Sequence, residues 1–70
     1  MSLGSKIKEA REFLGISQNT LAERVGISRV AIGYYERGVR VPNVEILKKI
    51  AQGLHTNIDY LLEKTEYYDT

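Results

Sequence analysis

Apolar residues recur along this chain at the spacing of amphipathic helices. Four of the first fifteen residues share one helical face: Leu3, Ile7, Ala10 and Leu14. Gly15 follows, and glycine tolerates the left-handed backbone that often ends a helix. The pattern predicts a first helix that begins near Ser2 or Ser5 and ends near Leu14.

Two further helices are predicted between Ser17 and Gly38, joined by the short turn Val25-Gly26-Ile27. Ser17 and Ser28 stand where these helices should begin, and each hydroxyl can accept a hydrogen bond from an unpaired N–H of the first turn. Two short helices joined by a turn of three or four residues that contains glycine are typical of a helix-turn-helix. The first hypothesis is therefore DNA binding, with the helix that begins at Ser28 as the reading helix.

The remaining apolar residues predict two more helices. Pro42 moves the residue before it out of helical geometry, and Asn43 can cap a fourth helix. That helix should pack through residues at the helical period: Val44, Leu47, Ile50, Ala51 and Leu54. His55 suits a left-handed position at its end, and Asn57 can cap a short fifth helix. The expected fold is all-α, a compact bundle of five short helices.

Composition narrows the class of protein. The chain has 70 residues, no cysteine and a net charge of only +1, and we find neither a signal peptide nor an apolar segment long enough to span a membrane. We therefore expect a single-domain cytoplasmic protein. Residues 1–42 hold seven basic and four acidic residues, whereas residues 43–70 hold three and five. The half with the helix pair thus carries the basic excess, as a DNA-facing side should.

No constellation of residues predicts catalysis, a metal or a cofactor. His55 is the only histidine and there is no cysteine to join it as a ligand. Asp59, Glu63 and Glu66 have no accompanying nucleophile or base, so they are read as a solvated face. We expect no enzyme activity, no metal, no cofactor and no small-molecule ligand.

Taken together, these positions resemble the Cro/repressor-type helix-turn-helix regulators, the lambda repressor-like group. The resemblance covers roughly residues 3 to 63. It rests on a set of residues in family order: Ile7, Arg11, Ser17-Gln18, Leu21-Ala22, Gly26-Ile27-Ser28, Ile32, Glu36-Arg37-Gly38, Pro42, Leu47, Ile50-Ala51, Leu54, Ile58 and Leu61-Leu62. It implies a DNA-binding domain over residues 1–64, with the helix-turn-helix at 17–37 and a tail at 65–70.

The resemblance also implies two structural contacts. Arg11 lies beside the apolar face of the first helix, where an arginine either extends its head to water or pairs with a carboxylate. In the family this arginine pairs with a glutamate near the end of the third helix, here Glu36. The family's glutamine at the start of the second helix, here Gln18, braces the side chain that corresponds to Arg29.

Four residues of the third helix are predicted to read bases from its exposed face: Arg29, Val30, Gly33 and Tyr34. The Arg29 guanidinium suits guanine O6 and N7, and Val30 can contact a thymine methyl. Gly33 lacks a side chain and is expected to let the helix approach DNA closely. Tyr34 falls where the family often places a base-contacting residue, although packing is an alternative role for its ring.

Further residues are predicted to hold phosphates and so to position the protein. They lie at the two helix starts and around the loop after the third helix: Ser17, Gln18, Asn19, Ser28, Arg37, Arg40 and Asn43. Capping is a compatible role for the serines, and a plain surface charge is the alternative for the two arginines.

A domain of this size covers half of a palindromic site, so we expect a homodimer on double-stranded DNA with a palindromic operator. Tyr60, Tyr67 and Tyr68 are candidate dimer contacts, although the tail is alternatively frayed. The function expected is that of a small sequence-specific transcriptional regulator, of the repressor, phage or restriction–modification controller type. An antitoxin that binds its own operator and a toxin, or a protein-interaction module without DNA binding, are the alternatives.

Overall fold

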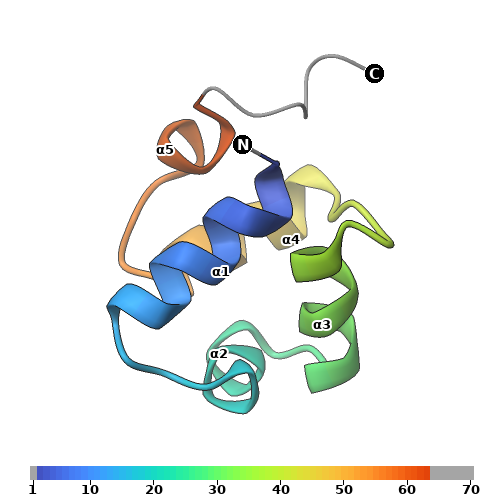
Figure 1. Ribbon diagram of the computed structural model, residues 1–70. Helices are drawn as coiled ribbons and strands as arrows, with labels where there is room; N and C mark the ends of the chain where they lie inside the picture. Colours follow the sequence, from blue (N-terminus) through green and yellow to red (C-terminus); the bar gives the residue numbers. More distant parts are fainter. Residues whose placement is uncertain (1, 64–70) are drawn as a thin grey trace.

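The computed structural model describes residues 2–63, and this part of the chain contains five helices and no strand (Figure 1). In chain order the helices are α1 (Leu3–Phe13), α2 (Gln18–Val25), α3 (Arg29–Arg37), α4 (Val44–Gly53) and α5 (Ile58–Leu62). The all-α prediction and the predicted order of five short helices are confirmed.

Each helix begins after a side chain that accepts a hydrogen bond from the backbone N–H three residues later. The oxygen–nitrogen distances are 2.8 to 3.1 Å, and the capping residues are Ser2, Ser17, Ser28, Asn43 and Asn57. Such caps satisfy donors that have no partner inside the helix. His55 has a φ of 58° after the end of α4, as its position predicts. Local hydrogen bonding therefore sets where the helices start.

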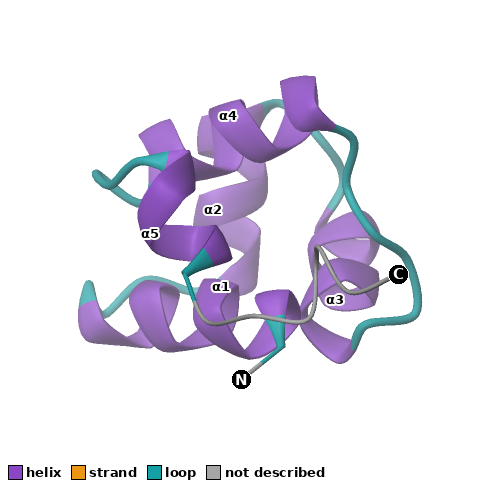
Figure 2. Ribbon diagram, turned by 90° about the horizontal axis from the view of Figure 1, so that it is seen from above, coloured by secondary structure: helices purple, strands orange, loops and turns teal. Residues whose placement is uncertain are grey.

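The core lies between α1 and α4, which Figures 1 and 2 place on opposite sides of the molecule. α1 packs against α3 and α5, while α4 packs against α2 and α5. Six side chains are almost completely buried there: Ile7, Leu21, Ile32, Leu47, Ile50 and Leu61. Ile7, Leu47 and Ile50 belong to the apolar stripes predicted for the first and fourth helices, and the other three are among the residues that carry the family resemblance. One apolar residue that was predicted to pack from the fourth helix lies outside the core. Val44 is the first residue of α4 and is 54% exposed.

Gly4 has a role that the hydropathy pattern does not indicate. A Cβ at this position would lie 2.5 Å from the backbone oxygens of both Tyr35 and Glu36. The start of α1 therefore packs directly on the backbone at the end of α3, which only glycine permits without a shift. This contact helps to place α3 relative to the rest of the bundle.

Within residues 2–63, none of the helices is both long enough and apolar enough to span a membrane. The predicted tail at 65–70, with Tyr67 and Tyr68, lies outside the described residues.

Candidate nucleic-acid interface

The turn between α2 and α3 is built around one glycine. Gly26 ends α2 with a φ of 82°, a left-handed conformation that costs glycine little. Its N–H bonds to the Ala22 carbonyl, and Ser28 then caps α3. The two helices pack against each other, with α3 at the edge of the molecule (Figure 1). This arrangement is the predicted helix-turn-helix.

A buried ion pair connects α3 to α1. Arg11 Nε donates to Glu36 Oε2 at 2.7 Å, and Arg11 Nη2 donates to Glu36 Oε1 at 3.2 Å. Only 11% of the Arg11 side chain and 2% of the Glu36 side chain are exposed. The hydrogen bond to Glu36 raises the pKa of the Arg11 guanidinium above its ordinary value. The predicted pair is thus present, and α3 is held at its C-terminal end.

Gln18 extends this network to the start of α3. Its Nε2 donates to Glu36 Oε1 at 3.0 Å, and its Oε1 accepts a long hydrogen bond of 3.5 Å from Arg29 Nη1. The predicted brace between Gln18 and Arg29 is therefore present. One of the two amide hydrogens of Gln18 is committed to Glu36, so one is left for a phosphate.

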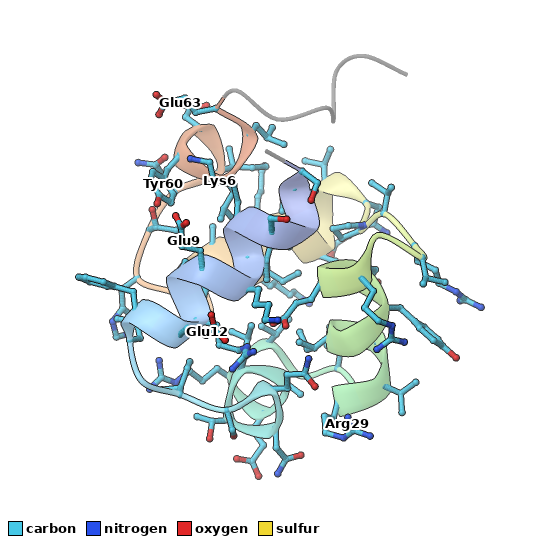
Figure 3. The ribbon with its side chains drawn as sticks, in the orientation of Figure 1. Lys6, Glu9, Glu12, Arg29, Tyr60 and Glu63 are labelled. Atoms are coloured by element: carbon cyan, nitrogen blue, oxygen red, sulfur yellow. The ribbon has the colours of Figure 1, made fainter. Side chains whose placement is uncertain are left out.

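Of the four residues predicted on the exposed face of α3, two are exposed, one is partly buried and one is buried. Arg29 is exposed and extends from the end of α3 (Figure 3). Val30 is 48% exposed, and Tyr34 is partly buried. Gly33, which was expected to be open to solvent, is buried instead. The reason is that the Arg37 guanidinium covers it, with Nη1 3.1 Å from where a Cβ of Gly33 would stand.

Two guanidinium groups lie close to the ring of Tyr34. Arg37 Cζ lies 5.5 Å and Arg40 Cζ 5.3 Å from the ring centroid, within the range of a cation–π contact. Both arginines are exposed, and among residues 2–63 neither side chain forms an ion pair or a hydrogen bond. The end of α3 and the loop after it thus present two uncompensated positive charges.

The other predicted phosphate contacts occupy the helix starts. Ser17 and Ser28 each use their oxygen as a cap, and Ser17 Oγ also donates to Thr20 Oγ1 at 3.1 Å. Asn19 is exposed on the first turn of α2. Asn43 is exposed too, and its Oδ1 accepts the hydrogen bond that caps α4.

Tyr60 lies on α5, well away from Arg29 (Figure 3). Tyr60 is 38% exposed, and Lys6 Nζ lies 4.3 Å from the centroid of its ring. Beside it is a mainly apolar hollow that Leu54 also lines, together with Phe13, which is 88% exposed. The sequence analysis did not single out Phe13, although an aromatic residue that lies off the apolar face of α1 indicates an exposed aromatic side chain.

In residues 2–63, no three His, Asp or Glu side chains come together as a metal site.

Residues 7–61 match the model of a helix-turn-helix family. The chain is 39% identical over 66 residues to the HTH-type transcriptional regulator ImmR of Bacillus subtilis, a match that covers 94% of this chain and 52% of ImmR. It is 39% identical over 61 residues to the repressor protein C2 of Salmonella phage P22, covering 87% of this chain and 28% of that protein. This chain thus spans about half or less of the length of these relatives.

Solved structures agree with these matches. The P22 c2 repressor in complex with a synthetic operator superposes with a TM-score of 0.85 at 38% identity, over 90% of this chain and 96% of that one. The restriction-modification controller protein C.AhdI from Aeromonas hydrophila gives a TM-score of 0.82 at 34% identity, over 84% and 89% of the two chains. The family model covers residues 7–61, and both the five-helix fold and the Arg11–Glu36 pair fit that family. The chain belongs to the Cro/repressor-type helix-turn-helix family.

Proposed function

We propose that this chain binds double-stranded DNA in a sequence-specific manner and acts as a transcriptional regulator. The observation that carries the proposal is the outer face of α3, where exposed polar and apolar side chains stand on a helix held rigidly by Arg11, Glu36 and Gln18. A helix of this width fits the major groove, where each base pair presents a distinct pattern. The similarity to a repressor solved with its operator supports the same role for α3.

Base reading falls to the first turns of α3. The Arg29 guanidinium can donate two parallel hydrogen bonds to a guanine, and its contact with Gln18 limits the directions it can take. Val30 offers an apolar contact for a thymine methyl, and Tyr34 lies one turn further along the same face. Gly33 lets α3 approach DNA closely only if the Arg37 side chain moves away from its position over Gly33.

Phosphates would be held on both sides of this helix. Ser17, Gln18 and Asn19 lie at the start of α2, where the partial positive charge of the helix end favours an anion. Arg40 and Asn43 lie in the loop after α3 and contribute charge and an amide donor. Ser28 contributes a hydroxyl at the start of α3. These contacts orient the protein on DNA and carry no sequence information of their own.

We propose that the regulator works as a homodimer on a palindromic operator in the cytoplasm of a bacterial or phage-infected cell. One copy of α3 covers one half-site, and a two-fold axis relates the halves. Tyr60 remains a candidate dimer contact, because the residue is partly exposed on α5. The relatives reported above are described as regulators, a repressor and a controller protein, so they lend no support to the antitoxin alternative.

Selection of bound duplexes from a random library tests the proposal. We expect enrichment of one palindromic sequence, with an affinity that falls steeply as salt concentration rises. The Arg29→Ala variant should relax the preference at particular base pairs. The Arg40→Ala variant should weaken all sequences equally and reduce the salt slope by about one unit. A wild-type protein that enriches no sequence would refute the proposed function, and unchanged relative affinities for Arg29→Ala would refute that residue's role.

A further inference from the structure

We propose that Arg37 reads base edges in the major groove, and that Gly33 makes this possible by leaving room for the Arg37 guanidinium on the outer face of α3. This inference rests on the proposed function and changes the role of Arg37 from a phosphate contact to a specificity-determining residue. It also gives Gly33 a defined task, which is to shape the position of another side chain.

The direction of the Arg37 side chain is the first observation. Side chains in a helix incline toward its N-terminus, so residue i lies over residue i−4. Accordingly, Arg37 extends back over Gly33, and its Nη1 and Cζ lie 3.1 and 3.9 Å from where a Cβ of Gly33 would be. The guanidinium therefore lies against the middle of α3 although its Cα belongs to the last residue of the helix.

The position of Arg37 around the helix is the second observation. Seven residues separate it from Val30, so the two point in directions that differ by only about 20°. Gly33 and Tyr34 flank that direction on either side. The guanidinium consequently lies at the centre of the face that contains Val30, Gly33 and Tyr34. A helix that enters the major groove brings the centre of this face nearest to the base edges.

The free hydrogen-bond donors of Arg37 are the third observation. The neighbouring carboxylate, Glu36, is buried and already accepts hydrogen bonds from Arg11 and Gln18. In residues 2–63 the Arg37 guanidinium has no hydrogen-bond acceptor, whereas its contact with the Tyr34 ring restricts its motion. A planar group with five free N–H donors is suited to the O6 and N7 acceptors of guanine.

Gly33 has no other explanation in the fold. Glycine in a helix interior is less favourable than alanine, so its presence needs a reason. At Gly4 the reason is the close approach of the α3 backbone, because a Cβ there would meet two carbonyl oxygens of α3. Within residues 2–63, and apart from its two chain neighbours and the backbone of its own helix, the only atoms within 4 Å of a Cβ at Gly33 belong to the Arg37 guanidinium. The absent side chain thus serves Arg37 and not the packing of the core.

The test measures the affinities of four variants for the operator selected by the wild-type protein and for its single base-pair substitutions, all at one salt concentration. We expect Arg37→Ala to lose about tenfold in discrimination at one or two base pairs of each half-site. Discrimination at the other base pairs should stay as it is in the wild type. Arg37→Lys should not restore it, because an ammonium lacks the planar fork. Gly33→Ala should unfold at or above the wild-type temperature and still change the preference at those same base pairs.

Arg40→Ala is the matched control, since Arg40 contacts the same tyrosine ring from the loop. It should weaken all duplexes by one factor. If Arg37→Ala behaves like Arg40→Ala, with uniform weakening and a flatter salt dependence, then Arg37 is a phosphate contact and the proposal is wrong. If Gly33→Ala retains the wild-type preference, the role given to Gly33 is wrong. A wild-type protein that selects no sequence would instead refute the proposed function, and base reading by Arg37 with it.

Discussion

Removal of the Glu36 carboxylate tests how α3 is held in place. The Glu36→Ala variant loses the acceptor of three hydrogen bonds, two from Arg11 and one from Gln18. It leaves the Arg11 guanidinium charged, because arginine keeps its proton inside proteins, and largely buried. Destabilisation should therefore come mainly from the charge that stays behind.

The expected magnitude follows from the burial of the pair. Breaking a buried ion pair by removing one partner costs about 3–5 kcal/mol. Arg11 Nη1 keeps its bond of 2.8 Å to the Ile16 carbonyl, which leaves the guanidinium partly partnered. We therefore expect a loss of about 3 kcal/mol, at the lower end of that range. For a domain of this size that corresponds to a fall in Tm of about 12–24 °C.

Unfolding in urea and on heating, both followed by helical circular dichroism, measures the loss. Glu23→Ala is the matched control, because Glu23 is exposed on α2 and should change stability by less than about 0.5 kcal/mol. The Arg11→Ala variant and the double variant complete a cycle, in which the two residues should couple by about 0.5–3 kcal/mol. Equal losses of stability for Glu36→Ala and Glu23→Ala would show that the pair does not hold α3.

Two further substitutions test local features of the fold. Gly4→Ala should lower the free energy of unfolding by about 1–3 kcal/mol, because the new Cβ would meet the Tyr35 and Glu36 carbonyl oxygens and force α1 away from α3; a thermal melt no lower than that of the wild type would contradict this close contact. Ser28→Ala removes the oxygen that accepts from the Ala31 N–H and should cost about 1 kcal/mol. Its measured loss in urea unfolding should resemble that of Ser17→Ala, and no change in either variant would argue against the caps.

Much of the fold could be predicted because its signals are local. A cap such as Ser28 acts on an N–H three residues away, and the apolar stripe of each helix depends on spacings of three and four. The buried pair of Arg11 and Glu36 is not local in the sequence, and it was predicted from the resemblance to a family. Its geometry and its connection to Gln18 came from the folded protein.

The candidate reading face shows where such prediction ends. Arg29 and Val30 are exposed as the helical period requires. The period also directs Gly33 outward, and yet Gly33 is buried. Whether a long side chain covers its neighbour depends on the partners available to that side chain, and here Glu36 is already bound to Arg11. That outcome is decided by contacts between α1, α2 and α3.

The sequence by itself thus determined the five helices, their caps, the turn at Gly26 and the family, because each depends on short-range hydrogen bonding or on an ordered pattern of residues. Only the tertiary structure decided that Gly4 sits on the backbone of α3 and that Glu36, bound to Arg11, leaves Arg37 free to lie over Gly33. Both facts depend on the distance at which two helices pack or on the charges left without a partner after packing. Those quantities arise when the helices come together, and no single segment of the chain specifies them.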